Sequence, residues 1–86
     1  MTLARQMAKK ATPRWKSLDF LIRGHGDITL GRVGPVSSAA VAADGDQMLA
    51  ALVRRRGESL EDLLTRLDEA LERRWEDDEL IDEING

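Results

Sequence analysis

The chain of 86 residues has no cysteine, no tyrosine and a single histidine, and these absences exclude several kinds of chemistry. Without cysteine there is no disulfide, no thiolate metal ligand and no cysteine nucleophile. The lone histidine, His25, has one nearby carboxylate, Asp27, whereas a zinc site takes three or four ligands. The glycines lack the flanking pattern of a phosphate-binding loop. We therefore expect no enzyme, no catalytic residue, no metal site and no cofactor.

Long apolar runs are also missing. No segment approaches the roughly 18–20 apolar residues of a membrane span. The basic N-terminus is not followed by the apolar block of about 7–15 residues that a secretory signal requires. Together with the lack of cysteine, this predicts a cytoplasmic protein that does not enter a membrane.

Aromatic residues are scarce: Trp15, Phe20 and Trp75 are the only three. Because each aromatic side chain buries roughly 150–250 Å², the core has to be built from leucine, valine, isoleucine and alanine. A domain of this size is close to the limit at which a core alone gives stability. A second copy or another partner would add to it, so we expect a homo-oligomer, most simply a homodimer.

The charges that are present are sorted along the chain. Up to Gly57 there are ten basic and four acidic residues, a net charge of +6; beyond it there are three basic and twelve acidic residues, a net charge of −9. Like charges gathered at a terminus favour solvated or partner-bound segments. We expect a basic N-terminal arm over 1–17, one compact domain over 18–75 and an acidic C-terminal arm over 76–86.

The clearest secondary structure is a helix over residues 60–74. From Leu60 onward, apolar residues recur three and four positions apart, which places them on one helical face. Ser59 stands at the N-cap position, and Arg73 and Arg74 stand in the last turn, where positive charge complements the helix dipole. The sequence thus predicts one long amphipathic C-terminal helix.

Three short strands are expected before this helix, over 28–33, 36–43 and 47–54. Gly34-Pro35 ends the first, and Asp44-Gly45 predicts a type I′ hairpin turn between the second and the third. The sequence therefore indicates an α+β fold, an antiparallel β-meander of about three strands packed on the long helix.

Alternation along a strand assigns side chains to two faces of the sheet. Ile28 and Leu30 share one face of the first strand. The apolar run over 18–22 is interpreted as one further strand. In the third strand one face is expected to carry Leu49, Ala51 and Val53, and the other Met48, Ala50 and Leu52.

A mostly helical alternative fits the same residues. Asp46 could cap a helix over 47–56 that ends at Gly57, and the alanine-rich segment 36–43 also suits a helix. Gly57 would then lie at the corner of a helix-turn-helix. The hairpin is favoured because Asp-Gly between two apolar runs of matching length is the more specific signal.

The C-terminal arm is the first candidate for a binding site. Aliphatic and tryptophan side chains alternate there with acids, which suits a hydrophobic groove rimmed by positive charge on another protein or on a second copy. We expect a non-enzymatic protein-binding or regulatory module that acts through this arm or through a sheet edge. The expected contact residues are Trp75, Asp78, Glu79, Leu80, Ile81 and Ile84.

A nucleic-acid-binding protein is the alternative function. Guanidinium and ammonium groups bind phosphates well, and basic residues cluster both in the N-terminal arm and just before Gly57. The sequence pI of about 5.1 argues against it, because a nucleic-acid-binding domain is usually basic. The residues that would bind phosphate are Lys9, Lys10, Arg14, Arg54, Arg55 and Arg56.

Overall fold

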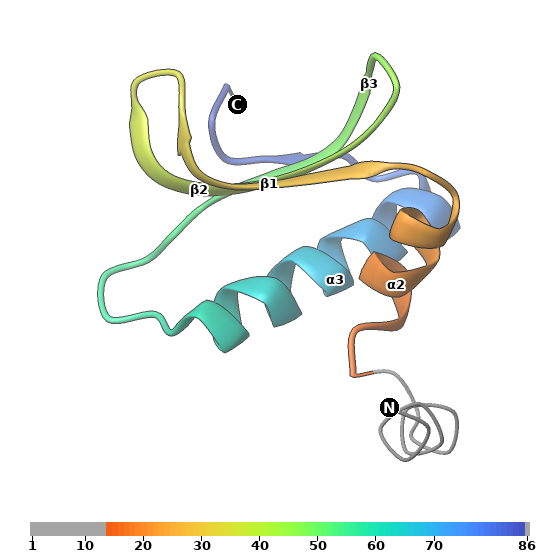
Figure 1. The fold of residues 1–86 in the computed structure, drawn as a ribbon, viewed down its shortest axis with the longest axis horizontal. Helices are drawn as coiled ribbons and strands as arrows, with labels where there is room; N and C mark the ends of the chain where they lie inside the picture. Colours follow the sequence, from red (N-terminus) through yellow and green to blue (C-terminus); the bar gives the residue numbers. More distant parts are fainter. Residues whose placement is uncertain (1–13, 86) are drawn as a thin grey trace, which may run out of the picture.

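The computed structural model describes residues 14–85, which form an α+β fold with a four-stranded sheet packed on two helices (Figure 1). The expected meander over a long C-terminal helix is confirmed, and the mostly helical alternative is wrong. The sheet order is β1-β2-β3-β4; the first three strands are antiparallel, and β4 runs parallel to β3. The elements are α2 (Lys16–Arg23), β1 (Asp27–Val33), β2 (Val36–Asp44), β3 (Gln47–Val53), α3 (Leu60–Asp77) and β4 (Ile81–Asp82).

Both hairpins of the meander have two-residue loops that begin with glycine. Gly34 has a φ of 57° and Gly45 a φ of 62°, a region that other residues rarely occupy. Asp46, the second loop residue after β2, does not have a positive φ. A positive φ at the first loop residue alone fits a type II′ turn, so the expected type I′ turn is wrong although the hairpin itself is present.

A β-bulge changes the expected faces of β3. Ala42 pairs with Ala50, but Ala43 pairs with Met48, so Leu49 is an extra residue without an opposite partner. Leu49 therefore joins Ala50 and Leu52 in the core cluster, where simple alternation had placed it on the opposite face. The bulge gives β3 three core side chains within four residues.

The core lies between the sheet and α3. Leu67 and Leu71 of α3 are fully buried, as are the alanines at the centre of the sheet. The small alanine side chains let α3 approach the strands closely, so that its leucines fill the space between helix and sheet. The Ser59 hydroxyl accepts a hydrogen bond from the backbone N–H of Asp62 at 3.0 Å, as the expected N-cap. The helix begins where predicted and continues three residues further, to Asp77.

The segment expected to be a first strand is the helix α2. Leu18 and Leu21, three residues apart, are its buried residues, and both belong to the core. The short apolar run did not reveal this period of three, which requires the neighbouring polar residues Lys16 and Asp19 to be read with it. A Cβ on Gly26 would lie 2.2 Å from Leu21 Cδ1, so only glycine lets the chain turn this tightly from α2 into β1.

Candidate functional site

The two edges of the sheet differ. On one side, β4 covers β3 over only two residues, Ile81 and Asp82. On the other side, β1 pairs with β2 alone, so its outer edge presents seven residues to which no described segment is bound. An unpaired edge offers N–H and C=O groups to another chain. Asp27 and Arg32, near the two ends of β1, form no ion pair within residues 14–85.

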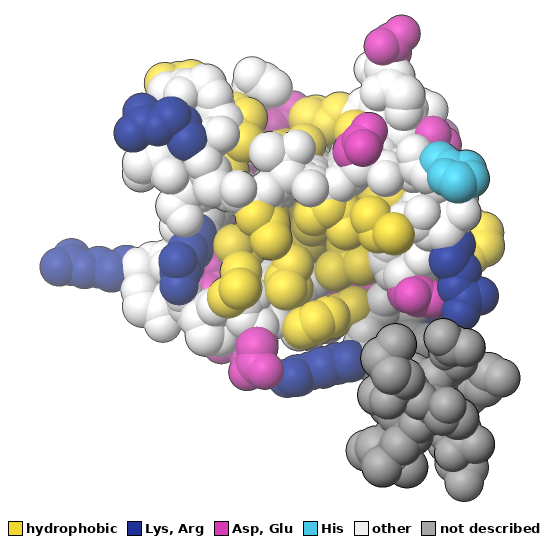
Figure 2. Space-filling model, in the orientation of Figure 1, with side chains coloured by type: hydrophobic (Ala, Val, Ile, Leu, Met, Phe, Trp, Pro, Cys, Tyr) yellow, Lys and Arg dark blue, Asp and Glu magenta, His cyan; other side chains and the backbone are white. Residues whose placement is uncertain are grey.

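An apolar groove of about 450 Å³ lies beside this edge, on the helical side of the sheet. Leu30 is 46% exposed and Ile22 is 51% exposed, so two large aliphatic side chains that line the same groove are both open to solvent. Figure 2 shows hydrophobic side chains gathered at the centre of one face, over the region where Figure 1 draws α3 below the sheet. The groove is lined by Arg14, Trp15, Leu18, Asp19, Ile22, Ile28, Leu30 and Leu64.

Polar contacts hold in place the wall of the groove that is formed by α2 and the two residues before it. The indole N–H of Trp15 donates to the hydroxyl of Thr65 at 3.0 Å. The Arg14 guanidinium lies 5.2 Å from the centre of the Trp15 ring and pairs with Glu61 at 2.9 Å. The backbone N–H of Leu18 donates to Asp68 at 2.9 Å. These contacts hold α2 against α3, so the groove is formed in the single chain.

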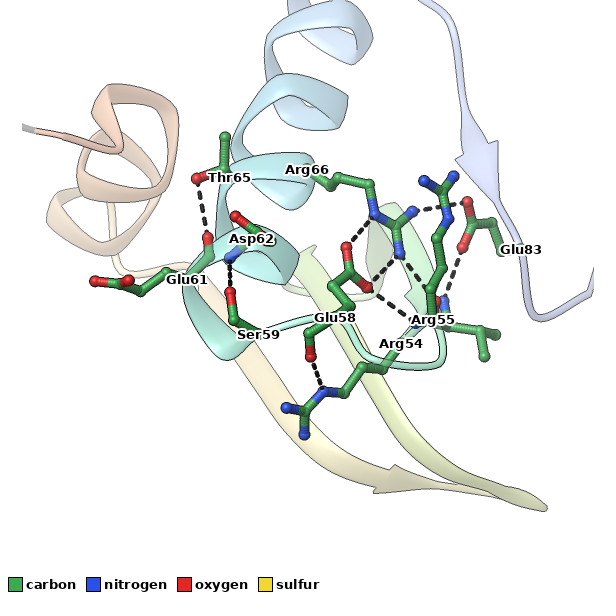
Figure 3. Close-up of polar contacts among 10 residues, drawn as sticks. Arg54, Arg55, Glu58, Ser59, Glu61, Asp62, Thr65, Arg66 and Glu83 are labelled. Carbon is green, nitrogen blue, oxygen red and sulfur yellow. Dashed lines mark hydrogen bonds and ion pairs between the residues drawn. The ribbon is translucent and has the colours of Figure 1, made fainter.

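The opposite edge of the sheet is closed by a cluster centred on Arg66 (Figure 3). Its guanidinium binds Glu58 through two nitrogens, at 2.7 and 2.9 Å, and also donates to Glu83 at 3.1 Å and to the Val53 carbonyl at 3.0 Å. Glu83 in turn accepts from the backbone N–H of Val53 at 2.9 Å, and its own N–H donates to Ala51 at 2.7 Å. We call Glu58, Arg66 and Glu83 the Arg66 clamp; it joins α3, the end of β3 and the chain after β4.

Hydrogen bonds in the clamp and in the turn next to it shift the pKa values of three side chains. The hydrogen bond from Arg66 lowers the pKa of Glu58 to about 2, against the opposing effect of burial, and the Arg55 N–H adds to the lowering. The same bond raises the pKa of Arg66 above its ordinary value. The pKa of Asp82 is lowered because its carboxylate accepts the backbone N–H groups of Asn85 and Ile84. Glu58, Arg66 and Asp82 therefore each favour the charged form in the folded chain.

The acidic C-terminal segment is part of the fold and not a separate arm. The boundary expected at residue 76 falls inside α3, and β4 completes the sheet. Asp78 ends α3 in a left-handed conformation beside Arg74, and Glu79 donates its N–H to the Arg73 carbonyl at 3.3 Å. The segment turns back because these residues end the helix and send the chain alongside β3.

The hydrophobic members of the expected C-terminal site are divided by this arrangement. Ile81 packs against the core, and Ile84 is half-buried in the turn that Asp82 holds. Leu80 is 51% exposed. Trp75 is exposed on one side and contacts Phe20 edge-on, with ring centroids 5.5 Å apart. Two of the four hydrophobic members, Ile81 and Ile84, are therefore partly buried within the fold, while Trp75 and Leu80 stay exposed.

The expected basic residues are also divided. Lys9 and Lys10 lie outside the described residues. Arg14 is engaged by Glu61 and Trp15, and the Nε of Arg54 donates to the Glu58 carbonyl at 2.8 Å. Arg55 and Arg56 are exposed, and the Arg55 side chain lines a cleft of about 200 Å³ beside the Arg66 clamp. That cleft also contains Arg73, Glu69 and Glu83, so its charge is mixed.

Residues 14–85 contain no group of three or more histidine, aspartate or glutamate side chains placed to hold a metal ion. Neither helix in this part of the chain is long and apolar enough to cross a membrane.

The groove is the feature that sequence reasoning missed. The alternation in β1 does place Ile28 and Leu30 on one face, and both line the groove. What the pattern could not show is that α3 lies under β2 and β3 and leaves this part of the first strand uncovered. The exposed residues of α2 were also misassigned, because that segment was expected to be a strand.

Fold and side chains together define a small α+β protein with one closed and one open sheet edge. Comparisons with models of protein families, with curated proteins and with solved structures give no match.

Proposed function

We propose that this protein is a small, non-enzymatic protein-binding module with a regulatory role, and that it binds through the edge of β1 and the groove beside it. The observation that carries this proposal is the coincidence of two features: an outer edge of β1 that no segment of residues 14–85 covers, and the exposed aliphatic side chains of Leu30 and Ile22 in the groove beside it. Neither feature alone would be as specific.

Edge strands are usually protected in monomeric proteins by charge, proline, short length or a covering segment. In β1 only Asp27 and Arg32 are charged, the four residues between them carry no charge, and proline is absent. An extended partner strand would gain backbone hydrogen bonds from β1 and would place every second side chain into the groove. This is the arrangement by which sheet edges commonly recognise other polypeptides.

The C-terminal segment has less support as the binding surface. Ile81 and Glu83 hold β4 and the Arg66 clamp in place, so a partner would have to displace them. The exposed residues that remain, Trp75 and Leu80, could contact a partner without such a change. They are therefore tested as the competing surface.

Nucleic-acid binding also has less support. Arg14 and Arg54 already have partners within the chain, and the cleft beside Arg55 holds two carboxylates. Carboxylates next to arginine reduce the positive potential that attracts phosphate. A gel-shift assay at low salt with duplex DNA and with single-stranded RNA would detect binding if this alternative were correct.

Site-specific photocrosslinking in the native host tests the proposed function. A photoreactive amino acid replaces Leu30 in one variant and Leu80 in a matched control of nearly equal exposure. We expect a covalent adduct with a polypeptide at Leu30 and none at Leu80. An adduct at Leu80 alone would assign binding to the C-terminal segment, and no adduct at either position would contradict the proposal.

A further inference from the structure

We propose that the polypeptide that binds the β1 edge is a second copy of this chain, an inference that rests on the proposed function. Two β1 strands would pair antiparallel about a two-fold axis at Thr29 and join two sheets into one of eight strands. Self-pairing of this kind requires one surface that is complementary to itself. The residues of β1 meet that requirement in charge and in shape.

The register follows from which residues share a face. In an antiparallel pair, opposite residues lie on the same face of the sheet. The two-fold axis keeps the helical sides of both copies on one face, and residues alternate between faces along β1. An odd-numbered residue can therefore lie opposite only an odd-numbered residue, and an even-numbered residue opposite only an even-numbered one. With Thr29 on the axis, Ile28 lies opposite Leu30 of the second copy, and Leu30 lies opposite its Ile28. Both residues are on the helical side, because their partners in β2, Ala42 and Ala40, are core residues.

Charge complementarity supports the same register. Asp27 lies opposite Gly31 of the second copy, and Arg32 follows directly at the bulge between Gly31 and Val33. Each copy thus brings the acidic end of its β1 beside the basic end of the other, twice about the axis, with Asp27 and Arg32 on opposite faces of the joined sheet. Neither residue has an ion-pair partner in the described part of its own chain. Parallel pairing would bring like charges together and is disfavoured.

The groove supplies the area that the strands alone lack. A stable interface buries about 800 Å² on each partner, more than a few paired residues provide. In the proposed dimer the two grooves lie on the same side of the joined sheet and meet at the axis. Leu30 and Ile28 of each copy then form one apolar layer across it, and the exposed Ile22 lies along the same groove.

Cysteine cross-linking tests the register, since the chain has no cysteine of its own. In Thr29→Cys the two thiols lie directly opposite, at a separation close to that of a disulfide. In Asp27→Cys, on the same face of the same strand, they lie about 13 Å apart, by about 3.3 Å per residue, too far to bond. Mild oxidation should convert Thr29→Cys to a covalent dimer and leave Asp27→Cys as a monomer. The opposite result would overturn this register.

Sedimentation equilibrium of the purified full-length protein tests the dimer itself. We expect a mass that rises with concentration to twice 9.6 kDa. Leu30→Lys should raise the dissociation constant at least about tenfold, because each copy would place an ammonium group against Ile28 of the other. Leu80→Lys should have no such effect, and circular dichroism should show both variants folded.

The outcomes separate this inference from the proposed function. A wild-type protein that stays at 9.6 kDa up to about 1 mM would overturn the dimer. If photocrosslinking at Leu30 then captured another polypeptide, the β1 edge would still be the binding surface. A dimer that Leu30→Lys does not weaken would place the interface elsewhere.

Discussion

The two edges of the sheet show how differently one chain treats equivalent positions. At the β3 edge, a short parallel strand and the Arg66 clamp occupy the backbone groups and bring together three charged side chains. At the β1 edge, residues 14–85 provide neither a covering strand nor an ion pair, and the aliphatic side chains of Leu30 and Ile22 are exposed beside it. Closure of the β3 edge requires the desolvation of charged side chains. The β1 edge has no such closure within the described residues, and an uncovered edge is suited to pairing with another polypeptide.

The closed β3 edge also accounts for part of the charge sorting along the chain. The acidic C-terminal third supplies Glu58 and Glu83, which surround one arginine of α3, while Asp82 holds the final turn. Two acids of the expected C-terminal arm, Asp82 and Glu83, are therefore used inside the fold. Of the remaining acids, Asp68 is half-buried and accepts the N–H of Leu18, and the others lie at exposed positions of α3 and the segment after it.

Replacing Arg66 by alanine should have the largest effect, because it opens the closed edge. The Glu58 side chain is only 8% exposed, and without Arg66 its charge is buried and unpaired. We expect a loss of about 3–5 kcal/mol in the free energy of unfolding. Urea denaturation measures it, with Arg73→Ala, an exposed arginine of the same helix, as the control. A loss no larger than that of the control would show that the clamp does not close the edge.

Acid should weaken the same edge. The folded pKa of Glu58, about 2, lies below its ordinary value of 4.5, so its contribution is fully present above pH 4.5 and is lost as the pH falls toward 2. The shift corresponds to about 3 kcal/mol. Unfolding free energies measured between pH 5 and pH 2 should fall accordingly. In Glu58→Gln the unfolding free energy should fall less steeply with decreasing pH. The pH dependence that remains would include a contribution from Asp82, whose pKa is also lowered.

Loss of the β4 contact should have a smaller effect. Ile81 packs against the core from β4 and is half-buried, so Ile81→Ala should cost about 2 kcal/mol, the lower end for removal of an isoleucine side chain. Leu80→Ala, at the neighbouring exposed position, should cost less than about 0.5 kcal/mol. Thermal denaturation compares the two, and equal losses would contradict the assignment of Ile81 to the core.

The meander and α3 could be predicted because each has a strong local signal. Asp44-Gly45 lies between two apolar runs, and Leu60–Leu71 keeps a helical period beginning at the N-cap Ser59. The sequence did not reveal β4, since two residues carry no period and their pairing with Ala50 and Ala51 is set by the tertiary fold. The same holds for α2, which is defined by its contacts with α3.

The candidate site was only half accessible to sequence reasoning. A sheet edge was predicted as one binding surface, but the alternation of side chains does not indicate which of the two outer strands of a meander keeps an uncovered edge. That choice depends on where α3 crosses the sheet and on β4 covering β3. The arginines before Gly57 looked free in the sequence because their partners, such as the Glu58 carbonyl for Arg54, become neighbours only through the local turn.

The smallest effect is expected at the open edge, and one matched pair of leucines isolates it. Leu30 of β1 and Leu52 of β3 flank the same residue of β2, Ala40, on its two sides. Leu52 is 2% exposed, so Leu52→Ala should cost about 3 kcal/mol, whereas Leu30→Ala should cost less than about 1 kcal/mol in dilute solution. Urea denaturation at rising protein concentration sharpens the comparison. If a second copy covers Leu30, the cost of Leu30→Ala grows with concentration, while that of Leu52→Ala, which is buried within one chain, changes much less.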